Sequence, residues 1–284
     1  MADPQVLHAS GAGLGIQLHS WPGPEPPVVA VHGLTANGRC WETIARELAG
    51  GRRLVALDLR GRGGSDKPEH GYDLEHHCAD LDGVLDDLGQ ERAVLMGHSL
   101  GAYISLAYAA TRPQRVERLI LVDGGAVLSP EQWGKVAQGI GPSLERLAQV
   151  YASVEDMLAQ VRQAPFLQPW NQATENYYRY DCIKVPGGVR SGTSSATVAE
   201  ERANLNKVDF SRFYSQVRCP VLVLRAGQGM LAPDQLVLPP DAAARLLRDL
   251  PQARLVELDR LNHFSIIFQP SPERAQAVRE FLTA

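Results

Sequence analysis

Short apolar runs alternate with amphipathic stretches along most of this chain. Several of the runs, such as Val28-Val29-Ala30-Val31 and Leu54-Val55-Ala56-Leu57, contain no polar residue. Runs of this length and composition are typical of strands in a parallel sheet that is covered on both faces. Such strands are expected at 28–31, 54–57, 93–96, 116–122, 220–224 and 254–258.

After most of these runs, apolar residues recur every three or four positions, as they do on one face of a helix. One apolar stripe, for example, consists of Leu74, Cys78, Leu81, Leu85 and Leu88. Further helices are expected at 41–48, 100–110 and 241–250, and a last one begins at Ser271-Pro272, a capping residue followed by proline. Residues 5–20 flank a glycine cluster and predict a β-hairpin. Strands and helices that alternate at short spacing predict an α/β fold with a doubly wound, mostly parallel sheet.

This alternation breaks between residues 128 and 209. The segment has helical stretches at 143–151 and 154–162, followed by an aromatic segment at 166–180. Glycine and proline at 185–192 indicate a loop. We therefore expect a helical insertion at 128–209, with residues 1–127 and 210–284 forming the core.

The pattern Gly97-His98-Ser99-Leu100-Gly101 connects the strand expected at 93–96 to the helix expected at 100–110. Gly-x-Ser-x-Gly in this setting is typical of a nucleophile elbow, where a tight bend lifts the serine hydroxyl away from the sheet. Glycine leaves room for the bend, and the start of the helix points backbone N–H groups at the same spot. We interpret Ser99 as a candidate catalytic nucleophile.

Other polar residues also come at the ends of predicted strands. His32, Asp58 and Asp123 occupy such positions, as Ser99 does. Ligands of doubly wound sheets bind beyond the carboxyl ends of the strands. Together the four residues outline one candidate site.

Composition narrows the possible functions. The chain has 284 residues, of which 44% are hydrophobic, and its net charge of -4 with scattered lysine and arginine gives no reason to expect a nucleic-acid partner. The four cysteines are far apart and form no metal-binding or redox pair. We expect no cofactor and no metal. No apolar run approaches the ~18 residues that span a membrane, and residues 1–5 lack the features of a signal peptide, so we expect no membrane partner and a cytoplasmic location.

With these motifs the chain resembles the α/β-hydrolase fold family over nearly its whole length. Four segments carry the resemblance in order: His32-Gly33, Asp58-Leu59-Arg60-Gly61-Arg62-Gly63-Gly64-Ser65-Asp66, the 97–101 turn, and Leu261-Asn262-His263-Phe264. The resemblance implies a sheet of about eight strands with a helical lid inserted after the sixth, where the segment 128–209 lies. It also implies a serine hydrolase, usually one that acts on esters or lactones of small molecules.

A serine hydroxyl needs an adjacent base, and the chain order in this fold is serine, acid, histidine. His263 is the only one of the eight histidines that follows Ser99, so it is the expected base. We favour Asp123 as the acid, because the end of the sixth strand is a rigid place for a carboxylate. Asp234, late in the loop after the seventh strand, is the alternative, since Gly229 or Met230 occupies the position usual in the family.

Further expectations concern the loops around the site and the insertion. The oxyanion hole is expected to use the backbone N–H groups of Leu34 and Leu100. Arg60 and Arg62 are expected to pair with Asp58 or Asp66 inside their turn rather than to bind a substrate carboxylate. The candidate pocket residues are the aromatic residues of the insertion: Trp133, Trp170, Tyr177 and Tyr178.

These residues predict a carboxylesterase-like serine hydrolase that cleaves carboxylic esters or lactones through an acyl-enzyme on Ser99. Its expected partner is a small-molecule ester or lactone. An alternative with the same residues is a C–C bond hydrolase or a perhydrolase, although the C–C hydrolases of this fold keep their acid after the seventh strand. A non-catalytic binding protein of the same fold is a further alternative.

Overall fold

The computed structural model describes residues 3–284 and contains an eight-stranded sheet with strand order β1-β2-β4-β3-β5-β6-β9-β10. Six neighbouring strands, from β4 to β10, run parallel, and β1 and β2 pair antiparallel at one edge. The strands are β1 (Gln5–Ser10), β2 (Gly15–Trp21), β3 (Val28–Val31), β4 (Leu54–Leu57), β5 (Ala93–His98), β6 (Val116–Val122), β9 (Val221–Gln228) and β10 (Ala253–Asn262). This confirms the doubly wound, mostly parallel sheet and the N-terminal hairpin.

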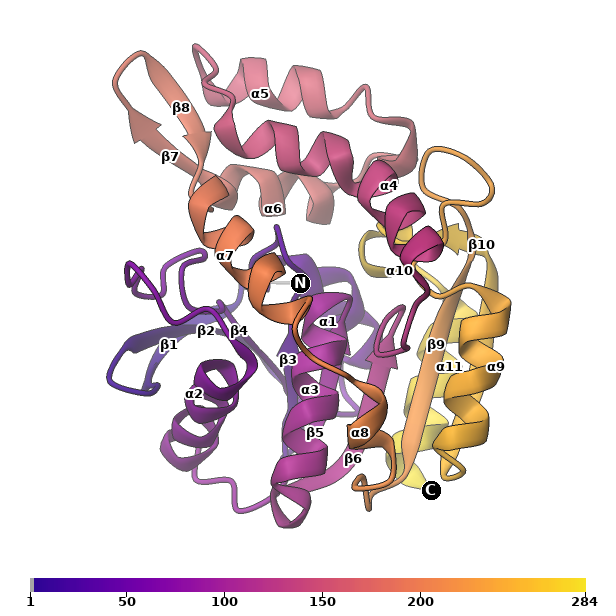
Figure 1. The fold of residues 1–284 in the computed structure, drawn as a ribbon. Helices are drawn as coiled ribbons and strands as arrows, with labels where there is room; N and C mark the ends of the chain where they lie inside the picture. Colours follow the sequence, from indigo (N-terminus) through magenta and orange to yellow (C-terminus); the bar gives the residue numbers. More distant parts are fainter. Residues whose placement is uncertain (1–2) are drawn as a thin grey trace.

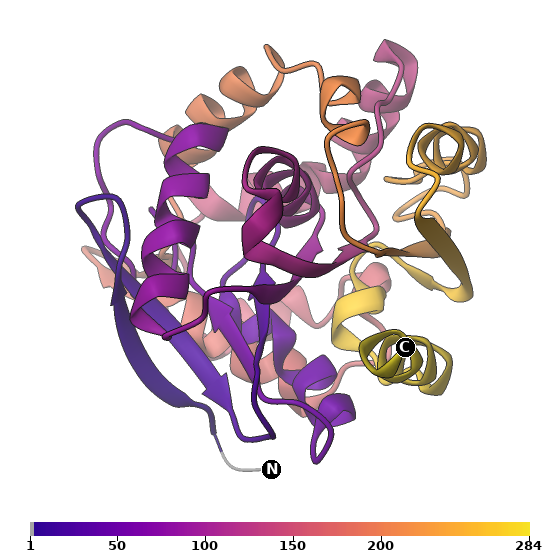
Figure 2. The ribbon, with the colours of Figure 1, turned by 90° about the horizontal axis from the view of Figure 1, so that it is seen from below.

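Helices cover both faces of the sheet (Figures 1 and 2). The core helices are α1 (Glu42–Leu48), α2 (Leu74–Asp87), α3 (Leu100–Thr111), α8 (Ser211–Tyr214), α9 (Pro240–Asp249), α10 (Ser265–Phe268) and α11 (Pro272–Thr283), with short 3-10 turns at Gly38–Trp41 and Pro113–Arg115. Alternate residues of β3 enter different apolar clusters, because side chains along a strand point to opposite faces. Val29 and Val31 pack with α2, α3 and α9, whereas Val28 and Ala30 pack with α1 and α11.

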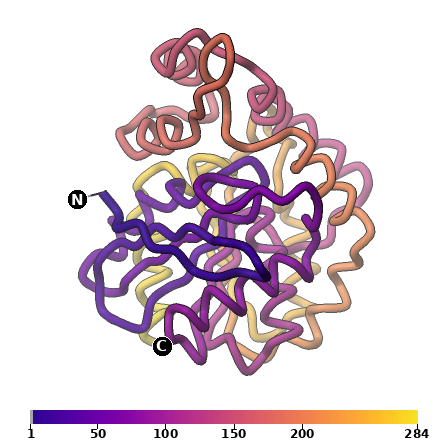
Figure 3. The backbone as a smooth tube through the Cα atoms, turned by 90° about the vertical axis from the view of Figure 1, so that its left-hand side faces the viewer, coloured from indigo at the N-terminus to yellow at the C-terminus, as the bar shows by residue number. Residues whose placement is uncertain are grey.

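The part of the chain from α4 to α7 lies as a separate layer beyond the carboxyl ends of the parallel strands (Figures 1 and 3). It contains α4 (Pro130–Ala148), α5 (Val154–Val161), a 3-10 turn at Pro165–Leu167, α6 (Gln172–Asp181) and α7 (Ser195–Leu205). Helix α4 begins well before the expected 143–151 stretch, because Ser129 and Gln132 form a capping box at its start. The aromatic segment is largely helical as α6. The proposed division into a 128–209 lid and a core stays a prediction.

One expectation about this segment is wrong. Residues 185–192, expected to be a loop, form part of a β-hairpin made of β7 (Cys182–Val185) and β8 (Gly188–Ser191). Glycine at 187 and 188 has positive φ of 90° and 146°, which suits the tight turn of a hairpin. The glycines therefore mark the turn between two short strands.

No helix in the described part of the chain is both long enough and apolar enough to cross a membrane.

Candidate active site

The turn at Ser99 has the geometry of a nucleophile elbow. Strand β5 ends at His98, helix α3 begins at Leu100, and Ser99 between them has φ 53° and ψ -118°. Within residues 3–284, Ser99 and Asp123 are the two non-glycine residues with positive φ. Such backbone strain costs energy and clusters at functional sites. A Cβ at Gly97 would lie 2.1 Å from the Gly101 carbonyl oxygen, so the bend requires glycine there.

His263 and Asp123 form a buried pair behind this turn. Nδ1 of His263 donates a hydrogen bond of 2.7 Å to Oδ2 of Asp123. The other oxygen of Asp123 accepts from the Ala226 N–H at 3.0 Å, which fixes the carboxylate against β9. With Nδ1 engaged, Nε2 is the nitrogen of His263 that remains for Ser99. This is the tautomer that a general base in this position needs.

Ser99 and His263 line the same cavity, but no hydrogen bond joins their side chains among the residues described. Catalytic hydrogen bonds are often long in ligand-free sites and tighten when substrate binds. The arrangement is therefore compatible with proton transfer between the two groups.

His98 supports His263 from the other side. Its Nε2 donates to the His263 carbonyl oxygen at 3.0 Å, and the two rings lie 4.5 Å apart between centroids. Burial, aided by repulsion from His263, holds the pKa of His98 well below its usual value, so His98 is neutral at physiological pH. The partner of His98 is thus distant in sequence and belongs to the site.

The structure does not bring Asp234 to His263. The Asp234 side chain is 63% exposed and lies 3.4 Å from Nζ of Lys135 on α4. The long loop after β9 carries it to the surface, whereas Asp123 is at the end of the strand beside β5. The geometry thus favours Asp123 over Asp234.

The expected oxyanion-hole residues also lie at the cavity. Leu34 and Leu100 both line it, next to Ser99. Neither backbone N–H has a hydrogen-bond acceptor within residues 3–284. Two unpaired donors beside a nucleophile can stabilise an oxyanion.

The cavity has a volume of about 330 Å³ and lies between the carboxyl ends of the strands and the 128–209 segment. Its walls are mostly apolar, with Trp133, Tyr177 and Tyr178 among the lining residues as predicted. Trp170 does not reach the cavity. Its ring stacks on Tyr178 at 5.8 Å and beneath the guanidinium of Arg162, so it lies behind the wall rather than in it.

Two arginines of the 128–209 segment complete the lining, and the sequence reasoning missed both. Arg146 on α4 is buried and pairs with Asp181 at 2.5 Å, whereas Arg202 on α7 has no carboxylate partner in the described chain. No aspartate or glutamate of residues 3–284 lines the cavity. Neither arginine belongs to a sequence motif, so only the placement of α4 and α7 over the sheet identifies them.

The expected partners of Arg60 and Arg62 are wrong. Arg60 forms a bidentate pair with Asp80 at 2.7 Å on both oxygens, and Arg62 pairs with Glu201. Asp58 is occupied elsewhere: its carboxylate accepts from Tyr180 and from the Gly38 N–H at 2.7 Å. The extended arginine side chains reach neighbouring elements, which a turn-based prediction does not consider.

No group of histidine, cysteine or acidic residues in the described chain has the arrangement of a metal site. All four cysteines are free thiols.

His32 joins the oxyanion loop to the 58–66 loop. Its Nδ1 donates to the Gly33 carbonyl at 2.8 Å, and its Nε2 accepts from the Leu59 N–H at 3.0 Å. Only the neutral ring can make both bonds. Burial lowers the pKa of His32 from 6.5 to about 4.

We expect the free energy of unfolding to rise with pH between about 4 and 6.5. In this window the unfolded chain binds a proton at His32 that the folded chain does not. The contribution of His32 to the free energy of unfolding is present in full above pH 6.5 and falls by about 3 kcal/mol as the pH drops toward 4. Urea unfolding at a series of pH values measures this slope. In His32→Gln the slope should decrease by about 1.4 kcal/mol per pH unit; an unchanged slope would contradict the assignment.

Known proteins are similar to this chain in sequence and in fold. The family model for the alpha/beta hydrolase fold matches residues 26–270. The chain is 27% identical over 263 residues to 2-(acetamidomethylene)succinate hydrolase of Mesorhizobium japonicum, covering 92% of this chain and 90% of that protein. It is 36% identical over 172 residues to 2-hydroxymuconate semialdehyde hydrolase of a Pseudomonas species, covering 57% and 58% of the two chains.

Among solved structures, the crystal structure of E-2-(acetamidomethylene)succinate hydrolase superimposes with a TM-score of 0.86 at 24% identity. The alignment covers 99% of this chain and 100% of that one. At this identity the likeness concerns the fold alone. Because the family model spans most of the sequence and the sheet has the expected eight, mostly parallel strands, the chain belongs to the α/β-hydrolase fold family.

Proposed function

We propose that this protein hydrolyses a small unsaturated substrate that carries a carboxylate, breaking a carbon–carbon bond next to a carbonyl group. Ser99 is the nucleophile, His263 the base, Asp123 the residue that orients His263, and the N–H groups of Leu34 and Leu100 bind the oxyanion. The specificity goes beyond the family membership, which supports only a hydrolase.

The observation that carries this proposal is the charge of the cavity. Arg202 is exposed to solvent on one side and has no acidic partner, the charge of Arg146 is balanced by Asp181, and no acidic side chain of the described residues lines the walls. A mostly apolar cavity with such a cation favours a small organic anion, since arginine binds carboxylates through charge-assisted hydrogen bonds. A neutral ester gains nothing from this arrangement.

The named relatives support the same substrate class. The compounds in the names of these two relatives, a substituted succinate and a hydroxymuconate semialdehyde, both carry carboxylates. These relatives favour the C–C hydrolase alternative over the ester or lactone prediction, which stays a prediction. The position of Asp123 after the sixth strand does not weaken the proposal, because the acid only needs to hold His263 in the right tautomer.

The chemistry follows from the placement of the side chains. Ser99 Oγ attacks the carbonyl carbon while its proton passes to His263 Nε2, and the carbonyl π electrons move to the oxygen. When the oxyanion collapses, the scissile bond breaks, and its electron pair goes to the leaving carbon, which takes the proton from His263. Water then attacks the acyl-Ser99 carbonyl carbon while His263 takes one of its protons. When this second oxyanion collapses, the bond to Ser99 Oγ breaks, Oγ takes the proton back from His263, and a carboxylic acid is released.

We expect Arg202→Gln to raise KM for a carboxylated oxo-dienoate by about 10- to 100-fold, because a charge-assisted hydrogen bond is lost. KM for an uncharged p-nitrophenyl ester should change by no more than about 2-fold. Lys207→Gln is the matched control: it removes a cation just beyond α7 that does not line the cavity. Initial rates on both substrates measure the effect.

The same assay decides the substrate class. The wild-type protein should hydrolyse the oxo-dienoate with a kcat/KM on the order of 100-fold above that for p-nitrophenyl esters or lactones of similar size. A preference for the esters, or an equal rise of KM for both substrates in Arg202→Gln, would contradict the proposed function.

A further inference from the structure

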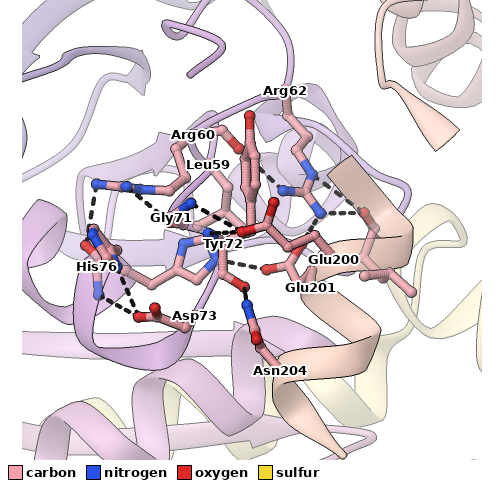
Figure 4. Close-up of polar contacts among 12 residues, drawn as sticks. Leu59, Arg60, Arg62, Gly71, Tyr72, Asp73, His76, Glu200, Glu201 and Asn204 are labelled. Atoms are coloured by element: carbon pink, nitrogen blue, oxygen red, sulfur yellow. Dashed lines mark hydrogen bonds and ion pairs between the residues drawn. The ribbon is translucent and has the colours of Figure 1, made fainter. Parts of the chain in front are cut away.

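A buried ion-paired cluster links the 128–209 segment to the loop that carries Leu34. It consists of Arg62 from the 58–66 loop, Glu201 from α7 and His77 from α2, and all three side chains are buried. Figure 4 shows Arg62 and Glu201 facing each other between the helix and the loop. None of the three side chains lines the cavity.

Arg62 holds the backbone of the oxyanion loop. Its Nη2 donates to the Leu34 carbonyl oxygen at 3.0 Å, and its Nε lies 3.4 Å from the same oxygen. Within residues 3–284, Arg62 is the only hydrogen-bond partner of that carbonyl. Fixing the Leu34 carbonyl restricts the backbone rotation next to the Leu34 N–H, which is the proposed oxyanion donor.

Glu201 holds Arg62 in turn. A fully buried guanidinium is costly unless it is paired, and Glu201 supplies the counter-charge. The second oxygen of Glu201 accepts from Nε2 of His77 at 2.5 Å. Burial alone would raise the pKa of Glu201, but Arg62 and His77 outweigh it and lower the pKa to about 2. The carboxylate therefore stays ionised throughout the neutral range.

Neighbouring residues fasten α7 to the core beside this pair (Figure 4). Glu200 accepts from the N–H groups of Gly71 and Tyr72 at 3.0 and 3.2 Å. The Asn204 side chain donates to the Tyr72 carbonyl at 3.0 Å. Arg202 comes directly after Glu201 and lines the cavity. One helix thus has an anchored side on the core and a residue facing the substrate cavity.

We propose that Glu201 and Arg62 are positioning residues for the oxyanion hole, with Glu201 acting through Arg62 on the Leu34 peptide. This inference rests on the proposed function. It makes α7 a fixed part of the active site rather than a lid that opens. It also gives Arg202 and Leu34 a common support, so that the substrate carboxylate and the oxyanion are held at a set separation.

The test is Glu201→Gln, which keeps the side-chain shape but removes the charge that holds Arg62. We expect kcat to fall about 10- to 100-fold while KM changes less than about 3-fold, because a displaced oxyanion donor weakens only the transition state. The affinity for a trifluoromethyl ketone, which forms a tetrahedral adduct on serine, should fall by the same factor as kcat. The affinity for the carboxylate product should stay unchanged.

Asp80→Asn is the matched control. It disrupts the buried Arg60–Asp80 pair on the same loop, and Arg60 makes no contact with the Leu34 carbonyl. Its kcat per folded molecule should stay within about 3-fold of wild type, even if stability falls. If Glu201→Gln does not fold, the double variant Arg62→Met/Glu201→Met replaces the pair by apolar side chains. The double variant should show the same loss of kcat.

The outcomes separate this inference from the proposed function. An inactive wild type that also fails to react with the ketone would overturn the proposed function. An active wild type with unchanged kcat and ketone affinity in Glu201→Gln, or in the double variant, would overturn the positioning role alone. An equal loss of kcat in Asp80→Asn would also overturn it, because the effect would then be general to the loop.

Discussion

Ser99→Ala is expected to lower kcat on the order of 10⁶-fold, the effect of removing the nucleophile from a serine hydrolase with an intact base. The fold should be unaffected, because alanine tolerates the positive φ of 53° at this position no worse than serine does. Substrate binding should survive, since the cavity walls and Arg202 are unchanged. Single-turnover measurements determine the loss of kcat. The enzyme concentration for them is taken from the mass of folded protein.

Residual activity in Ser99→Ala distinguishes the alternatives. Ser99 is supported as the nucleophile if the variant keeps only the slow rate that the oxyanion hole and substrate binding provide without a nucleophile. Its affinity for the product should be retained. A variant that keeps more than about one hundredth of the wild-type kcat would mean that the reaction does not pass through an acyl-Ser99.

Asp123→Asn is expected to lower kcat by about 10⁴-fold, whereas Asp234→Asn should stay within about 2-fold of wild type. The amide of asparagine can donate to His263 Nδ1, which would stabilise the wrong tautomer and leave Nε2 protonated. Asp234 is a surface residue paired with Lys135, so its loss removes one exposed ion pair. Steady-state kinetics on the two variants side by side measure the difference.

Thermal unfolding provides the control for this comparison. Asp123 also accepts from the Ala226 N–H, a contact that an asparagine oxygen can keep, so both variants should remain folded. A larger loss of kcat in Asp234→Asn than in Asp123→Asn would contradict the assignment. The acid would then be Asp234 in the loop after β9, and the position of His263 would have to be reconsidered.

Local pattern was sufficient for most of the fold. Apolar runs such as Val28–Val31 are strands because such a run can be buried only between two helical layers, and the structure has them at the expected positions. The turn at Gly97–Gly101 could also be predicted from sequence, because a tight bend between a strand and a helix leaves no room for side chains at its glycine positions. The register of the parallel strands then brings Asp123 next to the end of β5.

Features that depend on distant packing were not predictable. Glycine and proline at 185–192 indicate a loop and do not reveal the two short strands there, whose sequence has no clear alternation. Arg62 was expected to pair within its own turn, but its partner is Glu201, 139 positions away on α7. Arg146 and Arg202 face the cavity only because α4 and α7 lie over the carboxyl ends of the strands, and helical spacing does not encode that placement.

The central claim is that Ser99 is an activated nucleophile, and reaction with a fluorophosphonate followed by peptide mass spectrometry tests it most directly. The folded wild-type protein should acquire one phosphonyl adduct, located on Ser99, and Ser99→Ala should acquire none. Folded wild-type protein that remains unlabelled, or an adduct that persists in Ser99→Ala, would contradict the claim.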